Sequence, residues 1–237
     1  MAGRNVVKQA AGSGDRIRGV HLTFPAPAAI EVLASELDFI YLDGEHGCFT
    51  HRDLETACIT AERWGLTVIA RVPDGSEATI TGFLDRGVRG IVVPHIETVA
   101  DASAAVKAVY FAPLGERSFG GGRPTYTAIA DRQAHMLACN ADTSLCLMIE
   151  TRLGFEAAHE LAAVAGVDYL SFGRMDLAQA LGHPGEPAHP DCERAVADAT
   201  RRINAAGKRV REDFMHYAWI NDIVLTGARQ LLGARRG

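Results

Sequence analysis

Short apolar runs alternate with longer amphipathic segments along almost the whole chain. A strand buried on both faces of a parallel sheet has this continuous apolar character, whereas the segments between the runs repeat at helical spacing. The pattern predicts strands over 19–24, 39–43, 67–72, 90–94, 145–149 and 169–172, with weaker ones over 208–210 and 229–232. It predicts helices over 27–36, 51–64, 76–86, 99–111, 153–165, 189–206 and 216–226.

Eight strand–helix units in succession favour an α/β fold, a parallel (β/α)8 TIM barrel, with a doubly wound open sheet as the alternative. We expect one barrel domain over 15–237, preceded by a frayed, polar lead-in over 1–14. Only residues 233–237 follow the last predicted strand. The eighth helix of the barrel is therefore expected to be missing.

Titratable side chains stand where the predicted strands end. The run 39–43 closes on Asp43 and is followed by Glu45 and His46, and the next strand closes on Arg71. Glu150 and Asp176 follow two later strands in the same way. Because a barrel gathers the carboxyl ends of its strands at one face, this pattern predicts a catalytic mouth there. For the turn after 39–43, a solvated acidic strand end is the alternative.

These groups suit acid–base chemistry on a carbonyl compound. His46 stands three residues after Asp43, which can orient it as a general base. Arg71 either pairs with Asp43 or Glu45, or polarises a substrate carbonyl and stabilises an enolate.

Glu150 and Asp176 offer hard oxygen ligands for a divalent cation such as Mg²⁺, Mn²⁺ or Co²⁺. Two protein ligands would leave positions open for a bidentate substrate. The alternative is that each carboxylate caps a helix N-terminus. Backbone N–H groups over Gly173, Arg174 and Met175, at a predicted helix start, suit a carboxylate or a phosphate.

Composition excludes several classes of protein. The net charge of −5 over 237 residues is mild and does not suggest a nucleic-acid or membrane partner. Five cysteines without a CxxC pair are typical of reduced thiols in a cytoplasmic protein. The chain has no GxGxxG after a strand, no phosphate-binding GxxxxGK[ST] and no GxSxG.

The longest irregular stretch, 112–128, carries Gly120–Gly122 and the arginines Arg117 and Arg123. Loops of this length are usually functional, so we expect it near the mouth. Its arginines either bind an anionic arm of the substrate or are solvated. Six further histidines are expected mostly at the surface or in helix caps: His95, His135, His159, His183, His189 and His216.

Several motifs occur in a characteristic order and spacing. They are Leu42-Asp43-Gly44-Glu45-His46-Gly47, the strand end at Arg71, Val93-Pro94, Ala112-Pro113-Leu114-Gly115-Glu116-Arg117, Ile149-Glu150-Thr151-Arg152 and Gly173-Arg174-Met175-Asp176-Leu177-Ala178. Together they resemble the metal-dependent pyruvate aldolases of the HpcH/HpaI family, which include 4-hydroxy-2-oxoheptanedioate and 2-dehydro-3-deoxyglucarate aldolases. The resemblance covers roughly residues 15–232.

The resemblance implies a barrel of the phosphoenolpyruvate/pyruvate-binding type that cleaves or forms 4-hydroxy-2-oxo acids through a pyruvate enolate. Glu150 and Asp176 would bind the metal, and backbone amides near Met175 would hold the substrate carboxylate. Arg71 would stabilise the enolate oxygen. His46, oriented by Asp43, would act as acid and base through a water on the metal. The implied partners are a 2-oxo acid and an aldehyde or acyl-CoA, in a homo-oligomer.

The chain departs from the family pattern at the mouth. His21 stands where family aldolases often have Trp, Met148 where they have Gln, and Arg174-Met175 where they have Pro-Ala. These residues, with Gly173 and Arg123, are the substrate-binding candidates. One alternative activity is a citrate-synthase-like condensation of oxaloacetate with acetyl-CoA in siderophore or natural-product assembly, and macrophomate synthase is another relative. A non-catalytic barrel that binds a 2-oxo acid is the further alternative.

Overall fold

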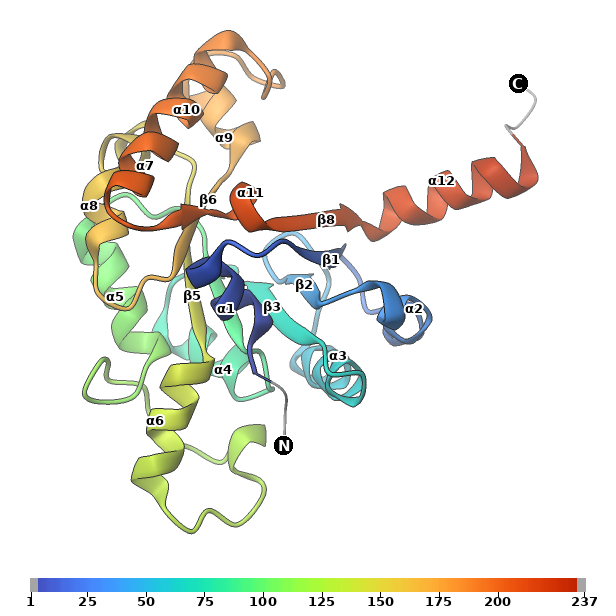
Figure 1. Cartoon of the computed structure of the whole chain (residues 1–237), viewed down its shortest axis with the longest axis vertical. Coiled ribbons are helices and arrows are strands. Elements are labelled where there is room, and N and C mark those ends of the chain that lie inside the picture. Colours follow the sequence, from blue (N-terminus) through green and yellow to red (C-terminus); the bar gives the residue numbers. More distant parts are fainter. Residues whose placement is uncertain (1–3, 234–237) are drawn as a thin grey trace.

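Eight parallel strands form one curled sheet in the computed structural model, which describes residues 4–233 (Figure 1). In spatial order the sheet runs β7-β6-β5-β4-β3-β2-β1-β8. The strands are β1 Ile17–Leu22, β2 Phe39–Asp43, β3 Thr67–Arg71, β4 Gly90–Val93, β5 Ser144–Ile149, β6 Tyr169–Phe172, β7 Arg209–Val210 and β8 Met215–Trp219.

This strand order confirms the barrel type over the doubly wound alternative. In a doubly wound sheet the order reverses at a switch point, whereas here each strand neighbours the next one in sequence and β8 returns to β1. β7 and β8 are the two ends of the sheet, and within residues 4–233 they are not paired with each other. The barrel therefore has an open seam.

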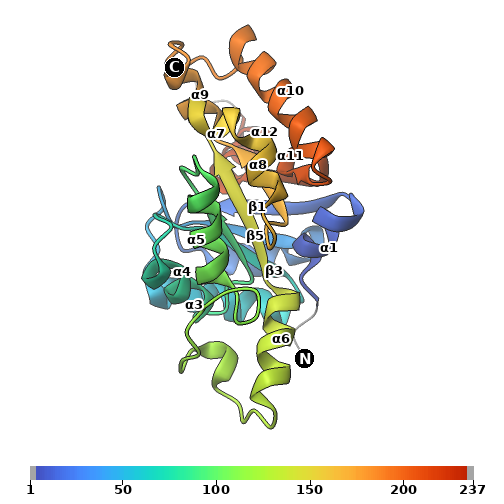
Figure 2. The same ribbon diagram turned by 90° about the vertical axis from the view of Figure 1, so that its left-hand side faces the viewer.

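Most helices lie outside the sheet and follow their strands as predicted. They are α2 Pro27–Leu33 with the 3₁₀ turn η1 Ala34–Glu36, α3 His51–Arg63, α4 Glu77–Leu84, α5 Val99–Val109, α7 Arg152–Glu156, α8 Ala158–Ala163, α9 Arg174–Ala180 and α10 Pro190–Ala205. Helix α6, Arg132–Asp142, was not predicted. None of its residues is buried, so it contributes little to the core. Figure 2 shows α6 and its preceding loop at one end of the molecule, and α9 and α10 at the other.

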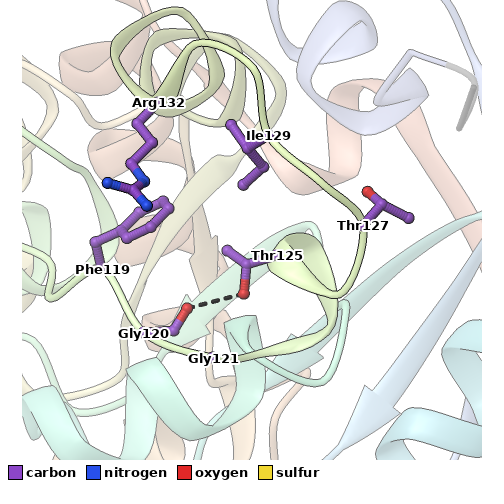
Figure 3. A pocket seen from close by; sticks show the side chains of 7 residues that line it. All are labelled: Phe119, Gly120, Gly121, Thr125, Thr127, Ile129 and Arg132. Atoms are coloured by element: carbon purple, nitrogen blue, oxygen red, sulfur yellow. Dashed lines mark hydrogen bonds between the residues drawn. The ribbon is translucent and has the colours of Figure 1, made fainter.

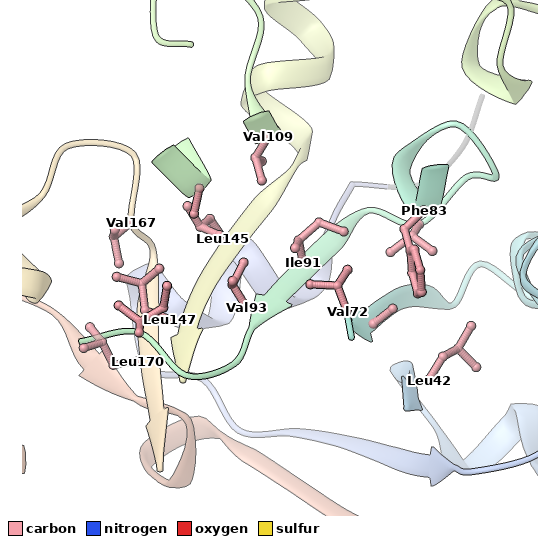
Figure 4. Close-up of a cluster of buried hydrophobic side chains, with 14 of the residues drawn as sticks. Leu42, Val72, Phe83, Ile91, Val93, Val109, Leu145, Leu147, Val167 and Leu170 are labelled. Carbon is pink, nitrogen blue, oxygen red and sulfur yellow. The ribbon is translucent and has the colours of Figure 1, made fainter. Parts of the chain in front are cut away.

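Alternate strand residues feed two separate apolar clusters. Ile91 and Val93 of β4 point outward against the helices, in the cluster drawn in Figure 4, whereas Val92 between them points into the barrel. Leu145 and Leu147 of β5 point outward likewise, and Cys146 points inward. This two-residue period gives a barrel both an outer core and a filled interior.

Helix α1, Val6–Ser13, closes the barrel at the amino ends of its strands. Val7, Ala10 and Ala11 are buried in the interior cluster with Ile17. The side chain of Asn5 caps the helix and also donates to Arg89 O at 2.8 Å, just ahead of β4. The predicted frayed lead-in is therefore wrong for this segment, because small apolar side chains fill the open end of the barrel.

The C-terminal part differs most from the prediction. Residues predicted as a helix over 216–226 form β8 and the start of a further helix, α12 Ile220–Leu232, and no strand occurs over 229–232. A full barrel helix is indeed missing, but it is the one between β7 and β8, where only α11, Arg211–Phe214, is found. Helix α12 projects away from the body (Figure 1). No helix within residues 4–233 is long and apolar enough to cross a membrane.

Candidate active site

Asp43 and Arg71 form the centre of the mouth, because β2 and β3 pair in a register that sets them side by side. The buried carboxylate of Asp43 accepts two hydrogen bonds from the guanidinium, from Nε at 3.1 Å and from a terminal nitrogen at 2.6 Å. The other terminal nitrogen of Arg71 lies 3.0 Å from Glu45 Oε2. This side-on pairing fixes the plane of the guanidinium.

Asp43 also organises the turn that follows it. Its Oδ1 accepts the backbone N–H groups of Glu45 and His46 at 3.2 and 3.1 Å. Burial alone would raise the pKa of Asp43, but hydrogen bonds from His21, Arg71 and the His46 N–H outweigh burial and hold the pKa well below its ordinary value. Asp43 is therefore a permanent anion at neutral pH.

The ring of His46 does not contact Asp43. Its side chain is 67% exposed, and its Nε2 lies 3.9 Å from Glu45 Oε2. The orienting contact expected from the sequence is not formed, because Asp43 is short and its oxygens already serve the turn, Arg71 and His21. Asp43 instead fixes the backbone from which His46 projects.

Glu150 is the second buried carboxylate at the strand ends, with 2% of its surface exposed. Its Oε1 accepts the His95 N–H at 2.8 Å and lies 3.1 Å from His95 Nδ1, while His95 Nε2 lies 3.2 Å from Glu45 Oε1. His95 therefore bridges two carboxylates. It does so from a φ of 55°, a left-handed conformation that residues other than glycine seldom adopt.

His95 is 59% exposed, in line with the surface position expected from the sequence, but its contacts with two carboxylates were not predicted. The signal that could have found it is its position, two residues after β4, at the same face as the other strand-end groups. Glu45, one of the two partners expected for Arg71, does contact Arg71, and it is shared with His95, which was not predicted.

Acidic groups crowd around Glu150. Burial raises its pKa, the N–H and ring of His95 lower it, and the charges of Asp176 and Glu45 raise it further, so that the pKa lies above its ordinary value. Gly173 leaves room for the carboxylate, since a Cβ there would stand 2.0 Å from Glu150 Oε2. Asp176 lies in the first turn of α9, three residues after Gly173.

This donor set fits a divalent cation. The oxygens are hard, their negative charges lie close together, and a cation would offset both the burial of Glu150 and the repulsion from its neighbours. The glycine keeps the space beside Oε2 clear of side-chain atoms.

The remaining mouth candidates divide into two groups. Met148 is buried with its sulfur 3.9 Å from Arg71, and His21 contacts Asp43 at 3.3 Å, so both adjoin the central pair. Arg174 instead pairs with Glu193 of α10 at 2.6 Å, while Met175 is largely exposed.

The structure does not bring Arg123 to the mouth. Arg123 pairs with Glu62 of α3, and its N–H donates at 2.7 Å to Asp85 O, at the end of α4. Arg117 binds the Asp85 carboxylate at 3.0 Å. The C-terminus of α4 leads into β4, so this loop lies at the amino ends of the strands. The expectation that the loop borders the site is therefore wrong, because a connection from a helix to the next strand runs at the opposite end of a barrel.

An open hollow of about 380 Å³ lies in the same loop region (Figure 3). It is lined by Phe119, Gly120, Gly121, Thr125, Thr127, Ile129 and Arg132. None of the strand-end residues contributes to it, so it is separate from the candidate active site.

His183, His189 and Asp191 cluster between α9 and α10, but their geometry suits a helix cap. The two rings stack 3.4 Å apart at 17°, so their nitrogen lone pairs lie in two separate, nearly parallel planes. His189 Nδ1 already accepts the Asp191 N–H, and Asp191 binds His183 Nε2 at 2.8 Å.

Known proteins share this sequence and fold. A family model for HpcH/HpaI aldolase/citrate lyase matches residues 20–223. The chain is 32% identical over 205 residues to hydroxypyruvate/pyruvate aldolase of Roseovarius nubinhibens, covering 86% of this chain and 80% of that protein. It is 33% identical over 211 residues to 4-hydroxy-2-oxovalerate aldolase of Rhodococcus jostii, covering 86% and 79%.

Solved structures agree with the sequence relatives. An HpcH/HpaI aldolase/citrate lyase family protein from Burkholderia cenocepacia superposes with a TM-score of 0.86 at 28% identity, over 96% of this chain and 98% of that one. Citrate synthase SbnG superposes with a TM-score of 0.76, also at 28% identity, over 94% and 86%. The family model covers most of the chain, and both relatives are matched over more than two thirds of their length. The chain therefore belongs to the HpcH/HpaI aldolase/citrate lyase family.

Proposed function

We propose that this enzyme is a metal-dependent carbon–carbon lyase that cleaves or forms 4-hydroxy-2-oxo acids through a pyruvate enolate. The observation that carries the proposal is the arrangement at the strand ends: Arg71, held flat by Asp43, shares one face of the barrel with the buried Glu150. The names of the relatives, pyruvate-type aldolases at 32% and 33% identity, support the same reaction class.

Glu150 and Asp176 would hold the divalent cation, with Mg²⁺, Mn²⁺ or Co²⁺ as the candidates. When bound, the cation supplies Lewis-acid activation that lowers the pKa of the methyl group beside the keto carbon. Gly173 contributes by leaving the Glu150 carboxylate free of a side-chain neighbour.

Arg71 supplies hydrogen-bond donors for the oxygen on which enolate charge develops. Its guanidinium is held by Asp43 on one side and by Glu45 on the other, so little reorganisation is needed when charge appears. The peptide N–H groups at Gly173–Met175 open helix α9, where the first turn leaves N–H groups without helical partners. They are our candidates for the carboxylate of the 2-oxo acid.

His46 is our candidate for the group that takes and returns the proton. Its ring projects into solvent from a backbone that Asp43 fixes, so it can exchange protons with water between turnovers. His21 and Met148 border the central Asp43–Arg71 pair and are the candidates for shaping the mouth around the second substrate, an aldehyde or an acyl-CoA.

Citrate-synthase-like condensation of oxaloacetate with acetyl-CoA is the second candidate, favoured by the structural likeness to citrate synthase SbnG. A homo-oligomer and a cytoplasmic location complete the proposal. The exposed apolar residues of α12 support the first, and the five unpaired cysteines support the second.

The proposal is tested by deuterium exchange into the methyl group of pyruvate, followed by ¹H NMR with Mg²⁺ or Mn²⁺ and after EDTA. We expect exchange that requires the metal and that falls by about 10²-fold or more in Glu150→Gln, because the buried carboxylate loses its charge. Glu160→Gln, an exposed change in α8, is the control and should exchange normally.

Two outcomes would redirect the assignment. Release of a free thiol from acetyl-CoA in the presence of oxaloacetate, without pyruvate exchange, would identify the condensing enzyme. Absence of both activities with every metal would leave only a barrel that binds a 2-oxo acid.

A further inference from the structure

His21 is a buried histidine beside the central ion pair. It is 3% exposed and lies on β1, in register with Tyr41 of β2 and with Trp219 of β8. Its ring stacks on Tyr41 at a centroid distance of 4.5 Å and 19°, and on Trp219 at 4.0 Å and 20°. Both faces of the imidazole are therefore covered, and only its edge is left to make polar contacts.

That edge meets Asp43. His21 Nε2 lies 3.3 Å from Asp43 Oδ2, the oxygen that also receives the 2.6 Å hydrogen bond from Arg71. Burial lowers the pKa of His21, and the nearby Asp43 carboxylate offsets only part of this effect. A neutral imidazole has one N–H to donate and Asp43 is the anion within reach, although neither ring nitrogen of His21 is aligned for a hydrogen bond in this structure.

The Asp43 carboxylate is held from three directions. The turn N–H groups bind Oδ1, Arg71 binds both oxygens, and His21 approaches Oδ2 from β1. A rotation of this carboxylate about its last side-chain bond would carry the guanidinium of Arg71 with it. The turn contacts hold only one of the two oxygens, so a donor on Oδ2 that is itself immobile completes the restraint.

We propose that His21 is a positioning residue, which fixes the Asp43 carboxylate in the plane that aims Arg71 at the reacting oxygen of the 2-oxo acid. The aromatic sandwich of Tyr41 and Trp219 supplies the rigidity, and the edge N–H supplies the contact. The catalytic consequence depends on the proposed function, whereas the effect on Arg71 can be measured without any reaction.

The test separates the ring from its polar edge. His21→Phe keeps an aromatic ring between Tyr41 and Trp219 but removes the N–H, whereas His21→Gln loses the stack and keeps an amide donor. Tyr217→Phe is the matched control, since Tyr217 contacts the His21 ring edge-on at 5.6 Å and its hydroxyl binds Arg211 and not Asp43. Unfolding curves of all three establish that each variant is folded before it is used.

Arg71 is then observed directly in ¹⁵N-arginine-labelled protein, with its Nε–H signal assigned from the spectrum of Arg71→Lys. We expect solvent exchange of this proton to be about tenfold faster in His21→Phe and near the wild-type rate in Tyr217→Phe. The rate of pyruvate methyl exchange should fall by about tenfold in His21→Phe at saturating pyruvate, with KM changed by less than about threefold. His21→Gln should recover part of both losses.

A double-variant comparison decides whether the effect passes through Asp43. In an Asp43→Asn background, adding His21→Phe should change the Arg71 signal and the rate by less than about twofold, since the contact is already altered. Unchanged Nε–H protection in folded His21→Phe, or a full loss that persists in Asp43→Asn, would overturn the proposal. Absence of pyruvate exchange in the wild type would refute the proposed function only, and the Nε–H measurement would still decide the role of His21.

Discussion

The charge balance at the mouth depends on Asp43 and Arg71 staying ionised and staying in position. Arg71 and Asp43 pair where both are sheltered from solvent, and such a pair is stable only if its remaining donors and acceptors are satisfied. The turn N–H groups bind Asp43 Oδ1, while Glu45 lies 3.0 Å from Arg71 and His21 lies 3.3 Å from Asp43. Removal of one partner would leave the other as an unpaired charge sheltered from solvent, which is why Asp43 and Arg71 act as a unit.

His21 should make the stability of the fold depend on pH. Burial, helped by the charges of Arg71 and Arg211, lowers its pKa, Asp43 opposes this, and the other titratable groups facing it are Tyr41 and Tyr217. In the unfolded chain the pKa of this histidine is about 6.5, so below that pH the unfolded state binds a proton more readily than the folded state does. The free energy of unfolding should therefore fall from pH 7.5 to pH 5.5 by more in the wild type than in His21→Phe. Urea unfolding at both pH values checks this, and an equal fall in the two proteins would contradict it.

At the scale of elements, α1 covers the barrel interior at the amino ends of the strands. We expect Val7→Asp to lower the free energy of unfolding by about 3 kcal/mol or more, because it places a carboxylate among Ala10, Ala11 and Ile17. Gln9→Asp, on the exposed side of the same helix, should change it by less than about 0.5 kcal/mol. Chemical denaturation measures both, and similar losses in the two variants would mean that the helix does not depend on its buried face.

The sequence predicts an element well when the element's burial is uniform. Strand β2 was predicted with its observed bounds because all of its residues are buried and a polar turn follows. Strand β8 was missed because it pairs only with β1 and several of its side chains are exposed, so it has no continuous apolar run. Helix α1 buries mainly small side chains, and α6 has no buried side chain, so neither stands out in the sequence as a core element.

The candidate site followed the same logic at finer scale. A polar group that ends an apolar run, such as Asp43, Arg71 or Glu150, is conspicuous in the sequence. The role of His95 depends on a left-handed backbone and on carboxylates from β2 and β5, which no local pattern shows. Arg123 was misplaced because its distance from the mouth is decided by which end of the barrel its loop crosses.

At the scale of the whole molecule, α12 leaves the body with its apolar side chains uncovered. Leu231 and Leu232 are each 86% exposed, and Val224 and Leu225, seven residues earlier, lie on the same helical face. In a homo-oligomer this face would be buried against another copy. We expect Leu225→Glu/Leu232→Glu to lower the molar mass measured by light scattering after size-exclusion chromatography, with Gln230→Glu unchanged. An unaltered mass in the double variant would assign the subunit contact to another surface.

The stack of Trp219 on His21 ties that projecting helix to the chemistry. Trp219 is the last residue of β8, and α12 begins at the next residue. The projecting helix is therefore joined directly to the indole that stacks on His21 at the catalytic mouth. A subunit contact that restrains α12 would therefore also restrain the Trp219 indole against the His21 ring, and His21 against Asp43. Turnover per subunit would then depend on the enzyme concentration, because dilution would separate the subunits and free α12 before the barrel unfolds.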